Sequence, residues 1–354
     1  MKRELNRILS ILQGKRCEVS NFDWYYTLGF LILNRIAIPF YRAASENKVE
    51  LPKSVHAFLE TLSEQQIQRN NIMEHWIADV SYELKGMKAP YAFLKGSVLS
   101  YCTFGGRYVY KYGERISNDI DILVSPKDLG ELDQILTDFG FVQGAWKDGR
   151  IVPFSRREIV YRRMTRGETA PYLIETQSKM VPFIELDVNY SLGYHPDKDL
   201  HQVEDLLCDV KPYQFVSRET IYSLTEEKFL LHLIMHQYKE ATLYWMVQRN
   251  KDSQLYKYLD IYRLLSGPGI DRKRFVSLVK EQDLCEETAY VLTLCYQLFH
   301  CNAIYEVLQA IGVNQLAVDL DKVDDAENRT TYQWTKGIFE RVGKYDKCRY
   351  LKKV

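Results

Sequence analysis

The chain has 354 residues, of which 46% are hydrophobic, so it is long enough for one large domain or two to three modest ones with a buried core. Lysine plus arginine and aspartate plus glutamate are equal at 47 each, which excludes a global electrostatic field that attracts nucleic acid or an anionic membrane. Seven scattered cysteines without a Cys-x-x-Cys pair argue against a typical zinc site and predict free thiols in a cytoplasmic protein.

The first 88 residues are predicted to form an N-terminal helical region. Apolar residues recur at helical spacing over residues 5–12 and again over 24–41, where Pro39 interrupts the pattern. A third, long helix is expected to run to about Glu83. The charged N-terminus lacks the apolar core of a signal peptide, and the apolar run 28–38 is too short to span a bilayer, so no membrane association is expected.

From Tyr91 onward the pattern changes to alternating strands and helices. We expect a helix from Ser97, a helix over residues 126–139 that ends at Gly140, and strands at 91–94, 119–124, 141–143, 158–164 and 181–190. Beyond Gly193 the pattern is helical again, with strong segments at 224–238, 255–265, 274–281 and 287–299. The sequence therefore predicts an α+β fold with a small mixed β-sheet core at 89–192, between helical regions at 1–88 and 193–354.

Lys95, Gly96 and Ser97 follow the short apolar run 91–94. Glycine permits close approach of the backbone, and the first N–H groups of a helix have no partners within it. Such a helix start is a suitable anion site.

Acidic residues alternate with apolar ones in two of the predicted strands. A period of two places Asp119 and Asp121 on one strand face, and it places Glu185, Asp187 and Asn189 on one face of another strand. Asp187 lies between apolar neighbours as Asp121 does, and Glu185 is a competing candidate for the third acid. Three acids on adjacent strands suit Mg²⁺, which prefers hard oxygen ligands.

This ordered set resembles the DNA polymerase beta-like nucleotidyltransferase superfamily, and within it the group called uncharacterised nucleotidyltransferases. The superfamily pattern is an apolar residue, Gly, and Gly or Ser, followed by Asp-x-Asp and a third strand acid. The corresponding residues here are Leu94, Gly96, Ser97, Asp119, Asp121 and Asp187. Lys95 fits the Leu-Lys-Gly motif of the group, Arg115 fits its Arg-x-x-x-Asp-x-Asp pattern, and residues 186–190 are similar to its Val-Asp-Leu-His-Trp, with Asn189 in place of histidine.

The resemblance implies a magnesium-dependent enzyme that transfers a nucleoside monophosphate from a nucleoside triphosphate, such as ATP, to an acceptor. It implies that Asp119, Asp121 and Asp187 bind two Mg²⁺ ions and carry out catalysis, and that Lys95, Gly96, Ser97 and Arg115 contact the triphosphate. The acceptor stays open between protein, RNA and a small molecule. The alternatives are a catalytically inactive nucleotide- or partner-binding module and a toxin-like transferase that acts on tRNA or protein.

Three further features have open interpretations. The segment 98–118 is long for the superfamily, and its Tyr108, Tyr110 and Tyr112 are candidates for shaping a substrate pocket. The basic stretch 147–166 is equally well interpreted as a patch that contacts triphosphate or an RNA acceptor and as a solvated hairpin face. His232 and His236 share a helix face, but without a third ligand they are interpreted as structural histidines, with His236 near Asp260.

Overall fold

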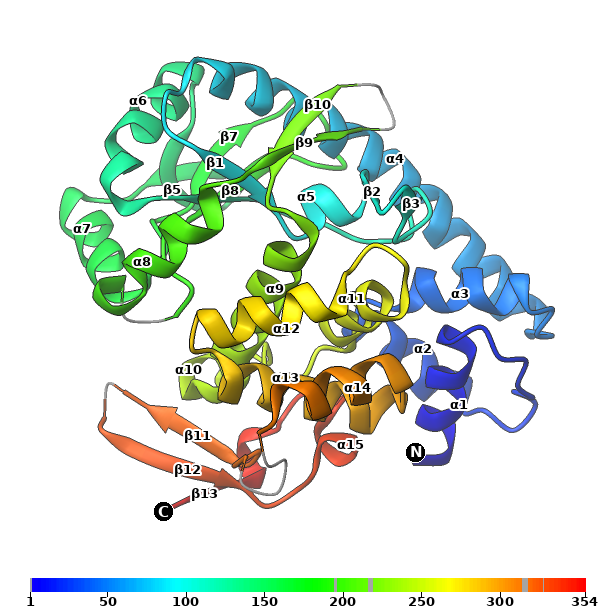
Figure 1. The fold of residues 1–354 in the computed structure, drawn as a ribbon. Helices are drawn as coiled ribbons and strands as arrows, with labels where there is room; N and C mark the ends of the chain where they lie inside the picture. The colour runs from blue at the N-terminus through cyan, green and yellow to red at the C-terminus, as the bar shows by residue number, and fades with distance from the viewer. Residues whose placement is uncertain (1, 194–195, 216–218, 314–317, 327) are drawn as a thin grey trace. The chain divides into compact units, whose positions relative to one another are not determined.

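The computed structural model describes residues 2–193, 196–215, 219–313, 318–326 and 328–354 (Figure 1). The chain forms two compact units: unit 1 is Met1–Glu64 together with Leu233–Val354, and unit 2 is Gln65–His232. Within the described part of the chain, no helix combines the length and apolar character that crossing a membrane requires.

Unit 1 is mainly helical and is assembled from two separate stretches of the chain. Its helices are α1 (Lys2–Leu12), α2 (Trp24–Leu33), α3 (Ala37–Glu46), the start of α4 (Lys53–Glu83), most of α9 (Glu226–Thr242), α10 (Tyr244–Gln248), α11 (Leu255–Ser266), α12 (Arg272–Glu281), α13 (Cys285–Phe299), α14 (Asn302–Ile311), α15 (Ile338–Arg341) and the 3₁₀ turn η3 (Cys348–Tyr350). A small antiparallel sheet, β11 (Lys322–Asp325), β12 (Thr330–Trp334) and β13 (Leu351–Lys353), packs Val323 and Trp334 against Val247 of α10.

Unit 2 is built on an eight-stranded mixed sheet in the order β6-β5-β7-β8-β4-β1-β10-β9. Its strands are β1 (Tyr91–Leu94), β4 (Ile120–Val124), β5 (Val142–Lys147), β6 (Arg150–Pro153), β7 (Tyr172–Glu175), β8 (Phe183–Asn189), β9 (Lys211–Gln214) and β10 (Thr220–Ser223). The other elements are η1 (Leu84–Gly86), α5 (Gly96–Leu99), the hairpin β2 (Thr103–Phe104) and β3 (Arg107–Tyr108), η2 (Pro126–Asp128), α6 (Leu129–Phe139), α7 (Arg156–Thr165) and α8 (Pro196–Leu207).

The centre of this sheet is buried. All four residues of β1 and all five residues of β4 are buried, as expected of strands covered on both faces. β4 pairs antiparallel with β1 and parallel with β8, so the two strands with the strongest apolar runs lie in the middle. The mixed sheet among helices confirms the predicted fold class.

Several predicted elements are confirmed. The long helix ends at Glu83, α6 ends at Gly140, whose φ of 108° is the left-handed conformation of a helix C-cap, and β8 lies within the predicted strand 181–190. The four helices predicted beyond residue 223 correspond to α9, α11, α12 and α13.

The strand predicted at 158–164 is wrong, because these residues belong to α7. Ser155 caps this helix: its hydroxyl accepts from the Glu158 N–H, and the Glu158 carboxylate accepts from the Ser155 N–H at 2.8 Å. This reciprocal pair is a capping box, whose Ser-x-x-Glu pattern is present in the sequence. The basic stretch is therefore a short hairpin, β5 and β6, followed by a helix.

Two other predictions need correction. The break in the second helical segment lies at residues 34–36 and not at Pro39, which sits in the first turn of α3 where its missing N–H costs no helical hydrogen bond. The region 193–354 is not wholly helical, because β9 to β13 lie within it. The parts of that prediction that fall on 194–195, 216–218, 314–317 and 327 lie outside the described residues.

Candidate active site

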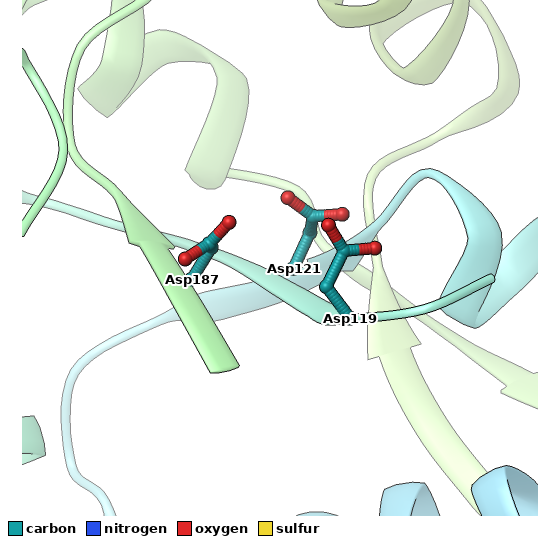
Figure 2. Close-up of side chains that lie close together, drawn as sticks. All are labelled: Asp119, Asp121 and Asp187. Atoms are coloured by element: carbon teal, nitrogen blue, oxygen red, sulfur yellow. The ribbon is translucent and has the colours of Figure 1, made fainter. Parts of the chain in front are cut away.

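Three aspartates meet at the neighbouring strands β4 and β8: Asp121 lies in β4, Asp187 lies in β8, and Asp119 directly precedes β4. The strands are parallel and place Asp121 directly opposite Asp187, so both side chains leave the same face of the sheet. Asp119, two residues before Asp121, shares that face. Ligand oxygens of the three aspartates, one from each, lie within 4.8 Å of one another. Figure 2 shows the carboxylates turned toward a common point, and we call Asp119, Asp121 and Asp187 the acidic cluster.

The acidic cluster concentrates negative charge in a poorly hydrated place. Burial raises the pKa of Asp121 to about 6, because the attraction of Lys95 only partly opposes burial and the repulsion of Asp119 and Glu168. Burial, followed by the charges of Asp119 and Asp121, raises the pKa of Asp187 well above its usual range. A divalent cation relieves this repulsion, and carboxylate oxygens are the ligands that Mg²⁺ prefers. The residues present therefore fit a divalent metal ion.

Comparison with known proteins places this arrangement in a family. The family described as uncharacterised nucleotidyltransferase matches residues 20–300, which include the whole acidic cluster and most of the chain. The chain belongs to this uncharacterised nucleotidyltransferase family. Among solved structures, the chain is similar to an antigenic nucleotidyltransferase-like protein from Paracoccidioides brasiliensis, with 13% identity, a TM-score of 0.39, and coverage of 67% of this chain and 92% of that chain. No curated protein matches the chain significantly.

Lys95 is a cationic neighbour of the acidic cluster. β1 places Leu94 opposite Asp121, so the next residue, Lys95, lies beside that carboxylate. The Lys95 Nζ donates to Asp121 Oδ1 at 2.7 Å. The backbone of Lys95 has φ 48° and ψ −124°, a conformation that residues with a side chain rarely adopt and that costs about 1–3 kcal/mol. The surrounding fold thus holds a strained residue next to the carboxylates.

Gly96 and Ser97 open α5 beside this lysine. A Cβ on Gly96 would lie 2.2 Å from Ser117 Oγ, and Ser117 Oγ itself donates to the Asp119 carbonyl at 2.9 Å. The absence of a side chain at Gly96 therefore lets the start of α5 contact the loop that carries Asp119. Ser97 is fully buried, and its Oγ has no hydrogen-bond partner within the described residues, so it is a donor without an acceptor.

Arg115 is buried in the segment between α5 and β4. Its guanidinium donates to the Ile116 carbonyl, and its own carbonyl accepts from Ser100 Oγ at 3.2 Å. These contacts make Arg115 a support of the segment that leads to Asp119. Its predicted contact with the triphosphate stays a prediction, as do the roles of Lys95, Gly96 and Ser97.

The three tyrosines of the long segment before β4 have different environments. Tyr110 is 1% exposed and Tyr108 is 53% exposed. The Tyr112 hydroxyl donates at 2.8 Å to the Glu74 carboxylate in α4. Tyr110 and Tyr112 thus hold the segment in place, and Tyr108 is the one of the three that faces solvent.

Two acidic residues flank the acidic cluster. Glu185 lies two residues before Asp187 on the same strand face, and its charge contributes to the raised pKa of Asp187. Glu168 contributes to the raised pKa of both Asp121 and Asp187, and it forms a β-bridge with Asn189 at the end of β8. Sequence reasoning missed Glu168, because no strand pattern in residues 165–170 indicates that this segment lies beside β8.

His232 and His236, the two histidines that share a helix face in the sequence, both lie in α9. The His236 Nε2 lies 3.4 Å from Glu240 Oε2, one helical turn away, and Glu240 also pairs with Lys257 of α11. Within the part of the chain that the structure describes, the acidic cluster is the one group of three or more metal-ligating side chains, so the histidines are not part of such a group.

Proposed function

We propose that the protein transfers a nucleoside monophosphate from a nucleoside triphosphate to an acceptor hydroxyl. The observation that supports this proposal is the acidic cluster: one carboxylate from β4, one from β8 and one from the residue before β4 have ligand oxygens within 4.8 Å of one another, and Asp121 is only 1% exposed. Membership of a nucleotidyltransferase family agrees with it. Three carboxylates this close together, one of them buried, repel one another, which is costly without a cation and useful with one.

In this proposal the acidic cluster holds two Mg²⁺ ions. Asp119 and Asp121 bind the ion that accompanies the triphosphate, and Asp187 joins them around the second ion. When bound, the ions neutralise the phosphate charge and activate the acceptor oxygen. The Lys95 ammonium, already at the rim of the cluster, adds a further positive charge for the phosphates.

The reaction itself requires mainly orientation from the protein. The acceptor oxygen forms a bond to the α-phosphorus while the bond from that phosphorus to the bridging oxygen breaks, so pyrophosphate leaves and the acceptor proton passes to solvent. The unpartnered Ser97 Oγ and the N–H groups of Gly96 and Ser97 are the proposed donors to the leaving phosphates.

The test replaces each aspartate of the acidic cluster with asparagine. The purified protein is incubated with each labelled nucleoside triphosphate, Mg²⁺ and a cell extract, and transferred label is measured. Asp119→Asn, Asp121→Asn and Asp187→Asn are each expected to reduce transfer at least about 100-fold, because each removes charge that holds the ions at the reacting phosphate.

Glu185→Gln is the matched control, because it removes one carboxylate from the same strand face two residues from Asp187. This variant is expected to retain transfer. Transfer that survives Asp187→Asn but not Glu185→Gln would assign the third acid to Glu185. A folded wild-type protein that transfers no label, and whose melting temperature is the same with and without Mg²⁺ and nucleotide, would contradict the proposed function.

A further inference from the structure

Helix α7 carries an unusual excess of positive charge for a chain whose net charge is zero. The segment 147–166 contains seven basic residues and two acidic ones. The basic residues are Lys147, Arg150, Arg156, Arg157, Arg162, Arg163 and Arg166. None of the ten residues of α7 is buried, so the helix contributes little to the core of unit 2. Its composition is therefore not explained by packing.

The exposed side of α7 combines free cations with apolar side chains. Arg156, Arg157 and Arg163 are exposed, and within the described residues no ion pair joins them to a carboxylate. On the same helix, Tyr161 is 58% exposed and Met164 is 75% exposed. We call Arg156, Arg157, Tyr161, Arg163 and Met164 the α7 surface. In the part of the chain that the structure describes, the three arginines of this surface therefore have no carboxylate partner.

The end of α7 is tied to the strand that carries Asp187. The Tyr190 hydroxyl donates to the Arg163 carbonyl, and the Tyr190 N–H donates to the Gly167 carbonyl at 3.1 Å. Gly167 has φ 63°, and a Cβ there would lie 2.8 Å from Ser191 Cβ, so this contact depends on glycine. Because Tyr190 is three residues beyond Asp187, the C-terminal end of α7, which carries Arg163 and Met164, contacts the end of the strand that carries Asp187.

We propose that the α7 surface binds the acceptor of the transfer reaction and that this acceptor is a single-stranded polynucleotide; the inference rests on the proposed function. Arginine forks match phosphate oxygens, and arginine is one of the residues that donate to the phosphates of nucleic acids. An exposed tyrosine beside the arginines offers a stacking surface for a nucleotide base. An acidic peptide has no bases, so the tyrosine favours a polynucleotide over such a peptide. A polyanion is repelled by the acidic cluster, so exposed cations elsewhere on unit 2 are needed to hold it while its terminal hydroxyl reaches the reacting phosphate.

The experiment compares the full-length wild-type protein with Arg156→Glu/Arg157→Glu/Arg163→Glu. Binding of a labelled 20-nucleotide single-stranded RNA, a DNA of the same sequence and a polyglutamate peptide is measured between 50 and 200 mM salt. The triple variant is expected to bind the polynucleotide at least about tenfold more weakly. The salt slope, which is the slope of the logarithm of the binding constant against the logarithm of the salt concentration, is expected to be smaller in magnitude by about 2, because each lost phosphate contact on a single strand reduces it by about 0.7. Tyr161→Ala is expected to weaken binding about tenfold without changing the slope.

The matched control is Lys273→Glu/Lys352→Glu/Lys353→Glu, which makes the same change in charge at three exposed lysines of unit 1. It is expected to bind as the wild type does. The conservative Arg156→Lys/Arg157→Lys/Arg163→Lys variant keeps the charge and is expected to recover most of the salt slope, which separates lost contacts from misfolding.

Transfer of labelled nucleotide to the RNA or DNA completes the test. The wild type is expected to label one of them, and the glutamate variant is expected to label it at least about tenfold less at limiting polynucleotide. Polyglutamate that binds as tightly as the polynucleotide, or polynucleotide binding that is equal in the wild type and the glutamate variant, overturns the proposal. Label that passes to a protein or small molecule instead also overturns it but leaves the proposed function standing, whereas absence of transfer to any acceptor contradicts the proposed function itself.

Discussion

At the scale of single residues, the candidate site depends on two neighbours with opposite constraints. Lys95 has a side chain in a backbone conformation that favours glycine, and it uses that side chain to reach Asp121. Gly96 has no side chain because Ser117 occupies the space next to it. The two constraints together position the start of α5 against the loop that carries Asp119.

Gly96→Ala is expected to lower the free energy of unfolding by about 1–3 kcal/mol, because the new methyl group must displace Ser117. The double variant Gly96→Ala/Ser117→Gly removes the obstructing Cβ and is expected to recover part of the loss. Urea unfolding measures both effects.

Gly130→Ala is the control for that measurement. Gly130 lies in α6 with nothing within 4 Å of its ideal Cβ, so alanine there is expected to stabilise the protein by about 0.5–1 kcal/mol. If Gly96→Ala and Gly130→Ala change the free energy of unfolding equally, the closeness of Gly96 to Ser117 does not restrict the side chain at position 96.

At the scale of secondary-structure elements, a buried ion pair joins α9 to α11. Glu240 and Lys257 have side chains that are only 4% and 8% exposed, and His236 also contacts Glu240. Burial alone raises the pKa of Glu240, but the charges of Lys257 and His236 outweigh it and hold that pKa well below its usual range. The carboxylate is therefore ionised in the folded protein at pH values where the unfolded chain is already protonated.

Glu240→Gln is expected to lower the free energy of unfolding at pH 7 by about 3–5 kcal/mol, because it leaves Lys257 buried without its counter-ion. A depressed folded-state pKa stabilises the fold above the unfolded-state value of about 4.3, and this stabilisation is lost as the pH falls below it. Below about pH 5, stability should thus fall less steeply in Glu240→Gln than in the wild type.

The measurement is urea unfolding at a series of pH values from 7 downward. Glu306→Gln is the control, because its pair with Arg272 is exposed and contributes about 0–1 kcal/mol. If the free energy of unfolding falls equally steeply with pH in the wild type and in Glu240→Gln, the lowered pKa of Glu240 does not stabilise the fold.

At the scale of the whole molecule, unit 1 requires two stretches of chain that are far apart in sequence. Asn34, which caps α2 and is 3% exposed, donates to the Phe30 carbonyl at 3.0 Å and accepts from the buried Leu255 N–H at 3.1 Å. The Tyr256 N–H donates to the Asn34 carbonyl at 3.3 Å. One residue thus connects the end of α2 to the start of α11.

Asn34→Ala is expected to lower the free energy of unfolding by about 1–3 kcal/mol, because it leaves the buried Leu255 N–H without an acceptor. Amide hydrogen exchange should speed up in both α2 and α11, since the two stretches fold as one unit. Asn47→Ala is the matched control: Asn47 caps α3 and donates to the carbonyl four residues earlier, so its removal should affect α3 alone. Faster exchange confined to α2 in Asn34→Ala would argue against the connection.

The features that the sequence by itself determined, such as buried strands and helix ends, each depend on a few neighbouring residues. Apolar alternation around Asp121 and Asp187 indicates buried strands, and Gly140 marks a helix end, because each signal depends on a few neighbouring residues. The family resemblance also follows from such short patterns. The same locality explains the error at 158–164, where apolar and aromatic residues suggested a strand although the capping box at Ser155 favoured a helix.

What only the tertiary structure decided is which distant residues meet. The register of β4 on β8 places Asp187 opposite Asp121, and the return of the chain after α7 brings Glu168 to the end of β8. The strands β7 and β10 are not predicted from the sequence, and the structure shows them paired with β5 and β8 and with β1 and β9, respectively. Pairing between segments is a property of the folded chain, so no local pattern contains it.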